Sequence, residues 1–103
     1  MIYEYRVYEA TPGKMKILVE LMGKAVPFFQ KHGMKVVGCW TPAVGENDNR
    51  YIYILAFNDM AHLEKAWAAF RSDPDWRKAA GEYAKYGPTT GKIYNVILDE
   101  VPV

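Results

Sequence analysis

The stretch RYIYILAFNDMAHLEKAWAAF, residues 50 to 70, decides the fold of this chain. Its first eight residues are mostly β-branched, aromatic or aliphatic, a composition typical of a strand. Asp59 then offers a capping side chain for a helix. Apolar residues recur on one face of that helix, namely Leu63, Ala66, Trp67 and Phe70. The stretch therefore predicts a strand that leads directly into an amphipathic helix.

The residues before this stretch predict a hairpin and a strand–helix pair. Residues 34–41 carry β-branched and aromatic side chains, and the turn-rich loop 42–49 joins them to the strand at residue 50, which favours antiparallel pairing. Residues 2–10 predict a strand that ends at the turn signal Thr11-Pro12-Gly13.

A helix is predicted from about Lys14 to Lys31, where apolar residues alternate at spacings of three and four. His32-Gly33 marks its end. Pro27 lies inside the pattern, so it either bends the helix or makes its last turns a separate segment.

A third helix and a last strand follow residue 70. Asp73 is a candidate N-cap, and Pro74 follows it at the first helical position, so a helix is predicted to begin here. It is expected to run to about Tyr86, before Gly87-Pro88. Residues 92–100 are apolar and β-branched and predict the final strand.

The element order predicts an α+β, ferredoxin-like βαββαβ fold with an extra helix before the last strand. Its four-stranded antiparallel sheet would carry both main helices on one face. The chain has 103 residues, half of them hydrophobic, which suffices for one core but not for two. We therefore expect a single domain over residues 1–103.

Strand alternation suggests which side chains leave the helix-covered face. In the first strand we favour Glu4, Arg6 and Tyr8 on the open face. In the strand at residue 50 we favour Tyr51, Tyr53, Leu55 and Phe57 there. The reverse assignment is the alternative. An open face with Tyr8, Trp40, Tyr53 and Leu55 is too apolar for a monomer, so a homodimer is expected.

Charge and cysteine content exclude several classes of protein. Lys and Arg total 13 against 12 Asp and Glu, so neither nucleic acid nor an anionic membrane is a favoured partner. No apolar run could span a bilayer, so no membrane insertion is expected. Cys39 is the only cysteine, which fits a soluble, cytoplasmic protein. We expect it to be a small buried hydrophobe. No spacing of a metal site is present, and no metal or cofactor is expected.

Several short motifs, in this order and spacing, resemble the NIPSNAP-like family of the dimeric α+β-barrel superfamily, and the resemblance covers nearly the whole chain. They are Glu4-Tyr5-Arg6-Val7-Tyr8 leading to Pro12-Gly13-Lys14, Gly38-Cys39-Trp40, residues 49–55, and Ala66-Trp67 to Phe70 with Asp73-Pro74-Asp75-Trp76. The resemblance implies a protomer whose sheet packs on its twin to form a barrel with a cavity. The wider superfamily contains cofactor-independent monooxygenases, haem-degrading enzymes and other small-molecule converters, whereas NIPSNAP-like proteins largely lack an assigned chemistry.

The candidate pocket-lining residues are Arg6, Tyr8, Trp40 and Tyr53. Aromatic rings can sandwich a planar ligand, and Arg6 can pair with a carboxylate or enolate. The simpler alternative is that Arg6 pairs with Glu4 or with an acid of the partner chain while the aromatic residues fill a dimer core.

Other chemistry-bearing residues are expected to have structural roles. His32 ends a helix and His62 begins one, so we favour ordinary surface roles over acid–base chemistry or haem ligation. Trp67, Phe70 and Trp76 are expected to anchor the junction between the second and third helices.

Two functions from different classes stay open. The first is a small-molecule enzyme with a pocket in the sheet-lined barrel, such as a cofactor-independent oxygenase or isomerase of an aromatic or carboxylated compound. The second is a non-catalytic ligand-binding or scaffold dimer. Arg6 and Glu4 favour the first, and the lack of a well-placed histidine or reactive thiol favours the second.

Overall fold

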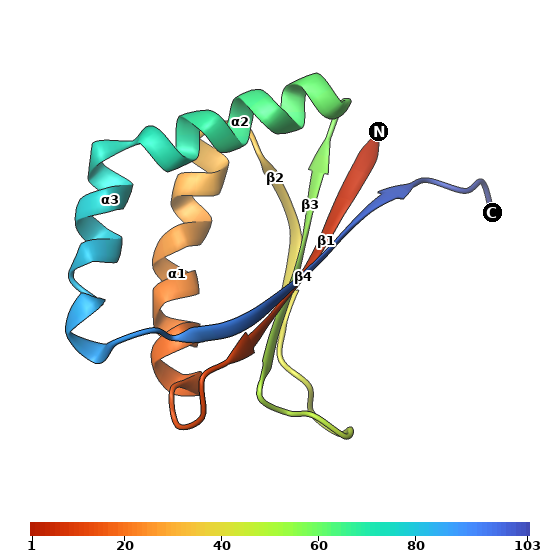
Figure 1. Cartoon of the computed structure of the whole chain (residues 1–103). Coiled ribbons are helices and arrows are strands. Elements are labelled where there is room, and N and C mark those ends of the chain that lie inside the picture. The colour runs from red at the N-terminus through yellow and green to blue at the C-terminus, as the bar shows by residue number, and fades with distance from the viewer.

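Four strands form one antiparallel sheet in the computed structural model, which describes residues 1–103 (Figure 1). In spatial order they are β2 (Lys35–Trp40), β3 (Arg50–Phe57), β1 (Ile2–Ala10) and β4 (Thr90–Asp99). The first and last strands of the sequence are thus neighbours in the sheet. This confirms the predicted α+β, ferredoxin-like plan.

The helices lie on one face of the sheet (Figure 1). They are α1 (Met15–Lys31), α2 (Met60–Ser72) and α3 (Pro74–Gly81). None of them combines the length and the apolar character needed to cross a membrane. Pro27 lies inside α1 without splitting it into two segments.

The third helix is shorter than expected. It ends at Gly81 and is followed by a turn and the short 3-10 helix η1 (Ala84–Tyr86). Glycine is a poor helix former because it loses the most backbone entropy, so the regular helix stops at Gly81 although the following residues keep a helical tendency.

The helix ends follow the local chemistry of the sequence. The Asp59 side chain accepts a hydrogen bond from the backbone N–H of His62 at the start of α2. The Asp73 side chain accepts from the N–H groups of Asp75 and Trp76 at the start of α3, whose first residue is Pro74. Both predicted caps are confirmed, and each satisfies backbone donors that the first turn of a helix leaves unpaired.

The favoured assignment of strand faces is wrong, and its reverse holds. Arg6 pairs with Tyr53 across β1 and β3, and Tyr8 with Tyr51, so these side chains share one face. That face lies under the helices, because the Tyr53 ring is 0% exposed and stacks on Phe29 of α1, with centroids 5.7 Å apart. β3 is apolar on both faces, so alternation alone does not select the covered one. Large rings fill the space between sheet and helices better than Ile52 or Ile54 would.

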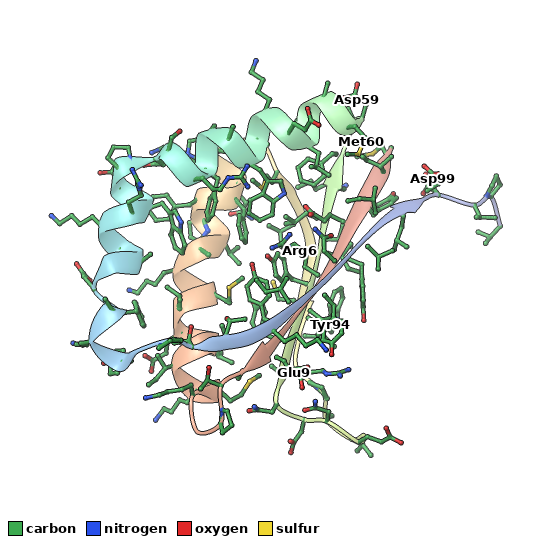
Figure 2. All side chains as sticks on the ribbon, viewed as in Figure 1. Arg6, Glu9, Asp59, Met60, Tyr94 and Asp99 are labelled. Atoms are coloured by element: carbon green, nitrogen blue, oxygen red, sulfur yellow. The ribbon has the colours of Figure 1, made fainter.

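The open face is nevertheless apolar. It carries Tyr5 and Val7 of β1 and their β4 neighbours Val96 and Tyr94, with Trp40 of β2 also on this side. Figure 2 shows Arg6 on the helix side of the sheet and Tyr94 on the opposite side. Every β4 residue after Thr90 is exposed. The expectation of an apolar open face therefore holds, although most of its residues differ from those named in advance.

Cys39 does not have the environment expected of it. Cys39 is exposed on β2, at the edge of the sheet. The prediction of a buried cysteine is wrong, because β2 has a neighbour on one side only and the helices leave this end of it uncovered.

Candidate functional site

A hollow of about 290 Å³ lies between α2 and the β1–β4 side of the sheet, on the face that the helices cover. It is lined by Glu4, Arg6, Leu63, Glu64, Trp67, Arg71 and Asn95. A larger hollow of about 370 Å³ has a lining that includes Glu20, Lys24, Asp75 and Lys78, all exposed. The hollow of about 290 Å³ is the candidate site, because its Glu4 and Arg6 are the most deeply buried charged side chains that line any of the three hollows.

Arg6 is the best-held charged group of this hollow. Its Nε donates to the Tyr53 hydroxyl at 2.8 Å, its Nη1 to Glu4 Oε2 at 3.1 Å and its Nη2 to the Tyr8 hydroxyl at 3.2 Å. A guanidinium has five N–H donors, so one N–H on each terminal nitrogen has no partner within the chain. The side chain is only 15% exposed. Its orientation is therefore set before any ligand arrives.

The charge of Arg6 is maintained by its neighbours. Burial alone would lower the pKa of Arg6, but Tyr53, Tyr8 and Glu4 together raise that pKa above its ordinary value. Burial also raises the pKa of Tyr53 strongly, so the Tyr53 phenol is neutral. The site thus combines a permanent cation with neutral hydroxyl groups.

The hydroxyl groups of Tyr53 and Tyr8 are joined by a hydrogen bond of defined direction. Arg6 donates to both hydroxyl oxygens, and Tyr53 donates to Tyr8 at 2.8 Å. The Tyr53 hydroxyl hydrogen therefore lies between the two hydroxyl oxygens, and the hydrogen of Tyr8 has no acceptor within the chain. Tyr8 itself does not line the hollow.

Glu4 is a buried carboxylate whose two oxygens are both occupied. Oε1 accepts from the Trp67 indole nitrogen at 2.6 Å, and Oε2 accepts from Asn95 Nδ2 at 2.9 Å and from Arg6. Such a fully paired carboxylate is an acceptor of fixed position rather than a free base. The expected alternative, that Arg6 pairs with Glu4, holds without closing the hollow.

The Trp67 ring lies close to two arginines. The guanidinium carbon of Arg6 is 4.7 Å from the ring centroid and that of Arg71 is 5.9 Å away. Trp67 packs in the core as expected, and it also lines the hollow and orients Glu4, a role that the structural interpretation had missed.

The structure places the four sequence-predicted pocket residues on two faces. Arg6, Tyr8 and Tyr53 come together under the helices, and of these only Arg6 directly lines the hollow. Trp40 lies on the opposite face with its ring over Gly38, where a Cβ atom would be 2.7 Å from the ring. Trp40 is therefore not part of this cluster.

Asn95 is a site residue that sequence reasoning did not find. It is the one polar residue in the run Ile93-Tyr94-Asn95-Val96-Ile97-Leu98, and it reaches Glu4 from the neighbouring strand. A lone amide in an otherwise apolar strand was the available signal, because it offers a side-chain hydrogen-bond donor that its apolar neighbours lack.

Both histidines make structural hydrogen bonds away from the hollow. His32 Nε2 lies 2.7 Å from Asp73 Oδ2, beside Lys31. His62 Nδ1 accepts from the Asn58 N–H, so its Nε2 carries the hydrogen and donates to the Gly33 carbonyl at 3.0 Å. No group of three or more His, Cys, Asp or Glu side chains has an arrangement suited to a metal ion.

The fold and the sequence are similar to those of known proteins. The mouse Protein NipSnap homolog 3B is 28% identical over 76 residues, which is 74% of this chain but 30% of that relative's length. A NIPSNAP domain protein of known structure from Burkholderia xenovorans is 20% identical, with a TM-score of 0.81 over 98% of this chain and 95% of its own.

A wider likeness concerns the fold alone. An antibiotic biosynthesis monooxygenase is 13% identical, with a TM-score of 0.65 over 99% of this chain and 100% of its own. The family model for NIPSNAP matches residues 3–103. Because that match covers all but two residues, the chain belongs to the NIPSNAP family.

Proposed function

We propose that this chain is one protomer of a homodimer and that each protomer binds a small organic molecule in the hollow under α2. The observation that carries the proposal is the buried, pre-oriented Arg6, which lines a hollow of about 290 Å³ and keeps two N–H donors unused. Water in the open hollow can satisfy these donors, and a ligand with matching acceptors, held by a cation that is already oriented, would take its place.

The open face of the sheet supports the homodimer. Tyr94, Val96 and Leu98 of β4 are exposed on it, and Trp40 is exposed at its other side. A contiguous apolar face of this kind is unfavourable in water and is covered when two copies pack sheet to sheet. The hollow lies on the other face, so dimerisation would leave it accessible.

The chemistry we propose is cofactor-independent oxygenation or isomerisation of an aromatic or carboxylated compound. Both reactions pass through an enolate or phenolate, in which negative charge develops on an oxygen. Arg6 lines the hollow with one free N–H donor on each terminal nitrogen, so two donors of fixed position can face that oxygen. Fixed donors of this kind stabilise an oxyanion without reorganising. The fold shared with a monooxygenase is consistent with this chemistry but does not select it.

The alternative is a non-catalytic ligand-binding or scaffold dimer. It is supported by the state of Glu4, whose oxygens already accept three hydrogen bonds, and by the absence of both histidines from the lining of the hollow. The other acid of the lining is Glu64, an exposed rim side chain with no ion-pair partner to hold it in place as a base.

One experiment tests binding and chemistry together. Small enolisable aromatic compounds and aromatic acids are screened against the 15N-labelled protein, and the indole N–H signal of Trp67 reports on the hollow. Bound compounds are then followed for oxygen uptake and for exchange of a carbon-bound hydrogen in D2O. Turnover supports the enzyme, and binding without either reaction supports the ligand-binding dimer. A Trp67 signal that no compound shifts contradicts the pocket itself.

A further inference from the structure

We infer that the hollow is a carboxylate site, in which a ligand carboxylate bridges the two terminal nitrogens of Arg6 while its organic part lies against Trp67. This rests on the proposed function of the hollow and names the class of ligand. The two unpartnered N–H groups of Arg6 belong to Nη1 and Nη2, the nitrogens that a carboxylate engages in a forked pair.

The surroundings of Arg6 favour this geometry over a single point contact. Tyr53 and Tyr8 hold one edge of the guanidinium and Glu4 holds Nη1, so its plane does not have to be ordered by the ligand. Pre-orientation of this kind lowers the entropic cost of binding. A lysine at this position would keep the positive charge but could not donate two parallel hydrogen bonds to a carboxylate.

The two charges of the rim provide a test of what is bound. Glu4 neutralises Arg6 inside the hollow, and the rim adds one cation, Arg71, and one anion, Glu64. Neither rim residue forms an ion pair within the chain. A bound carboxylate would therefore be attracted by Arg71 and repelled by Glu64, whereas a neutral ligand would be nearly indifferent to both.

The lining sets the rest of the ligand. Trp67 and Leu63 are the apolar residues of the hollow, and both belong to α2. The volume of about 290 Å³ is at the low end for an organic ligand. A planar acid with one ring, with its carboxylate on Arg6, matches this size and polarity.

The test compares benzoate with benzamide, which has the same shape without the charge. Each is titrated into 15N-labelled protein while the three indole N–H signals of Trp40, Trp67 and Trp76 are recorded. Trp40 lies on the opposite sheet face and Trp76 packs on Phe28, so these two are internal controls. We expect benzoate to shift the Trp67 signal at concentrations about tenfold lower than benzamide, as a charge-assisted pair predicts.

Variants of the rim residues Arg71 and Glu64 should change benzoate affinity in opposite directions. A folding defect would not produce such opposite effects, and both residues are exposed. Arg71→Met should weaken benzoate binding about twofold to fivefold and Glu64→Gln should strengthen it by a similar factor, as expected for exposed charges. Arg77→Met, on α3, is the matched control and should change nothing. Arg6→Lys should weaken benzoate binding about tenfold, measured at a temperature well below the thermal unfolding midpoint of the variant, because the three hydrogen bonds of Arg6 also stabilise the fold.

The outcomes separate the two proposals. Benzamide binding as tightly as benzoate, or rim variants that act in the same direction, overturns the carboxylate site but leaves a pocket. If neither probe shifts the Trp67 signal, the carboxylate site is overturned, and the screen of other compounds described above decides the pocket. If Arg6→Lys does not fold, the opposed effects of Arg71→Met and Glu64→Gln still decide the question.

Discussion

The indole nitrogen of Trp67 donates a 2.6 Å hydrogen bond to the buried carboxylate of Glu4, which joins α2 to the central strand β1. The same carboxylate holds Arg6, so one contact between residues 63 positions apart sets both the helix packing and the geometry of the hollow. The stability of the fold and the shape of the candidate site therefore depend on the same polar cluster.

Replacing Trp67 with Phe should destabilise the protein by about 1–3 kcal/mol, because Glu4 Oε1 loses its donor inside the structure. Chemical denaturation measures the loss. Trp76→Phe is the matched control, since the Trp76 indole donates no hydrogen bond and its ring packing on Phe70 is largely kept. Equal losses in the two variants would show that ring size, not the hydrogen bond, matters.

Asp73 should make the fold sensitive to acid. Its side chain is 2% exposed and accepts from Lys31 Nζ at 2.8 Å and from His32 Nε2 at 2.7 Å, while it caps α3. The hydrogen bonds from Lys31 and His32 hold the pKa of Asp73 well below its ordinary value of 3.8. A carboxyl whose pKa is lowered by folding stabilises the folded state above the unfolded pKa.

That stabilisation should be lost as the pH falls below about 4, because the unfolded chain then binds a proton that the folded chain does not. Asp73→Asn should lower stability at neutral pH and flatten the acid dependence. Urea unfolding midpoints at neutral and acidic pH measure both effects. Asp75→Asn, a neighbouring exposed carboxylate, should leave the acid dependence nearly unchanged, and equal flattening in both variants would contradict the assignment to Asp73.

The proposed dimer makes a prediction for two adjacent residues of β4. Val96 is 48% exposed on the open face, and Ile97 is 41% exposed on the helix-facing side. Val96→Lys should give monomers, because it places a charge in an apolar interface, whereas Ile97→Lys should leave the dimer intact. Sedimentation velocity at micromolar concentrations distinguishes them. A monomeric wild-type protein would remove the homodimer proposal.

Trp76→Ala should cost about 2–4 kcal/mol of stability. The Trp76 ring packs 4.8 Å from the Phe70 centroid and 5.7 Å from that of Phe28, so it joins α3 to both α2 and α1. Thermal and chemical unfolding measure the loss. Lys78→Ala on the same helix should have almost no effect, and an unchanged unfolding midpoint in Trp76→Ala would show that α3 is not anchored by this ring.

The order and the ends of the elements could be predicted because they depend on nearby residues. Asp59 caps α2 through its neighbour His62, and Asp73 with Pro74 starts α3. The error at the end of α3 has the same local origin, since Gly81 was given too little weight against the residues that follow it. These features arise from interactions within a few positions of the chain.

The site could be predicted only in part. Arg6, Tyr8 and Tyr53 are selected for their chemistry and do form one cluster, yet strand alternation assigns them to the open face. The partners that make a buried Arg6 acceptable are Tyr53 and Glu4, and Glu4 in turn needs Trp67 and Asn95. Those contacts join residues 47, 63 and 91 positions apart, which no local pattern reports.

By itself, the sequence determined the main strands and helices, the caps of α2 and α3 and the ferredoxin-like order of the elements, because hydrophobic period and capping chemistry act over a single turn or strand. Only the tertiary structure decided which face of each strand the helices cover. β3 presents apolar side chains on both faces, so the choice depends on how Tyr53 and Phe57 fit against Phe29 and α2, and on whether Glu4 can satisfy Arg6 and Trp67 at once.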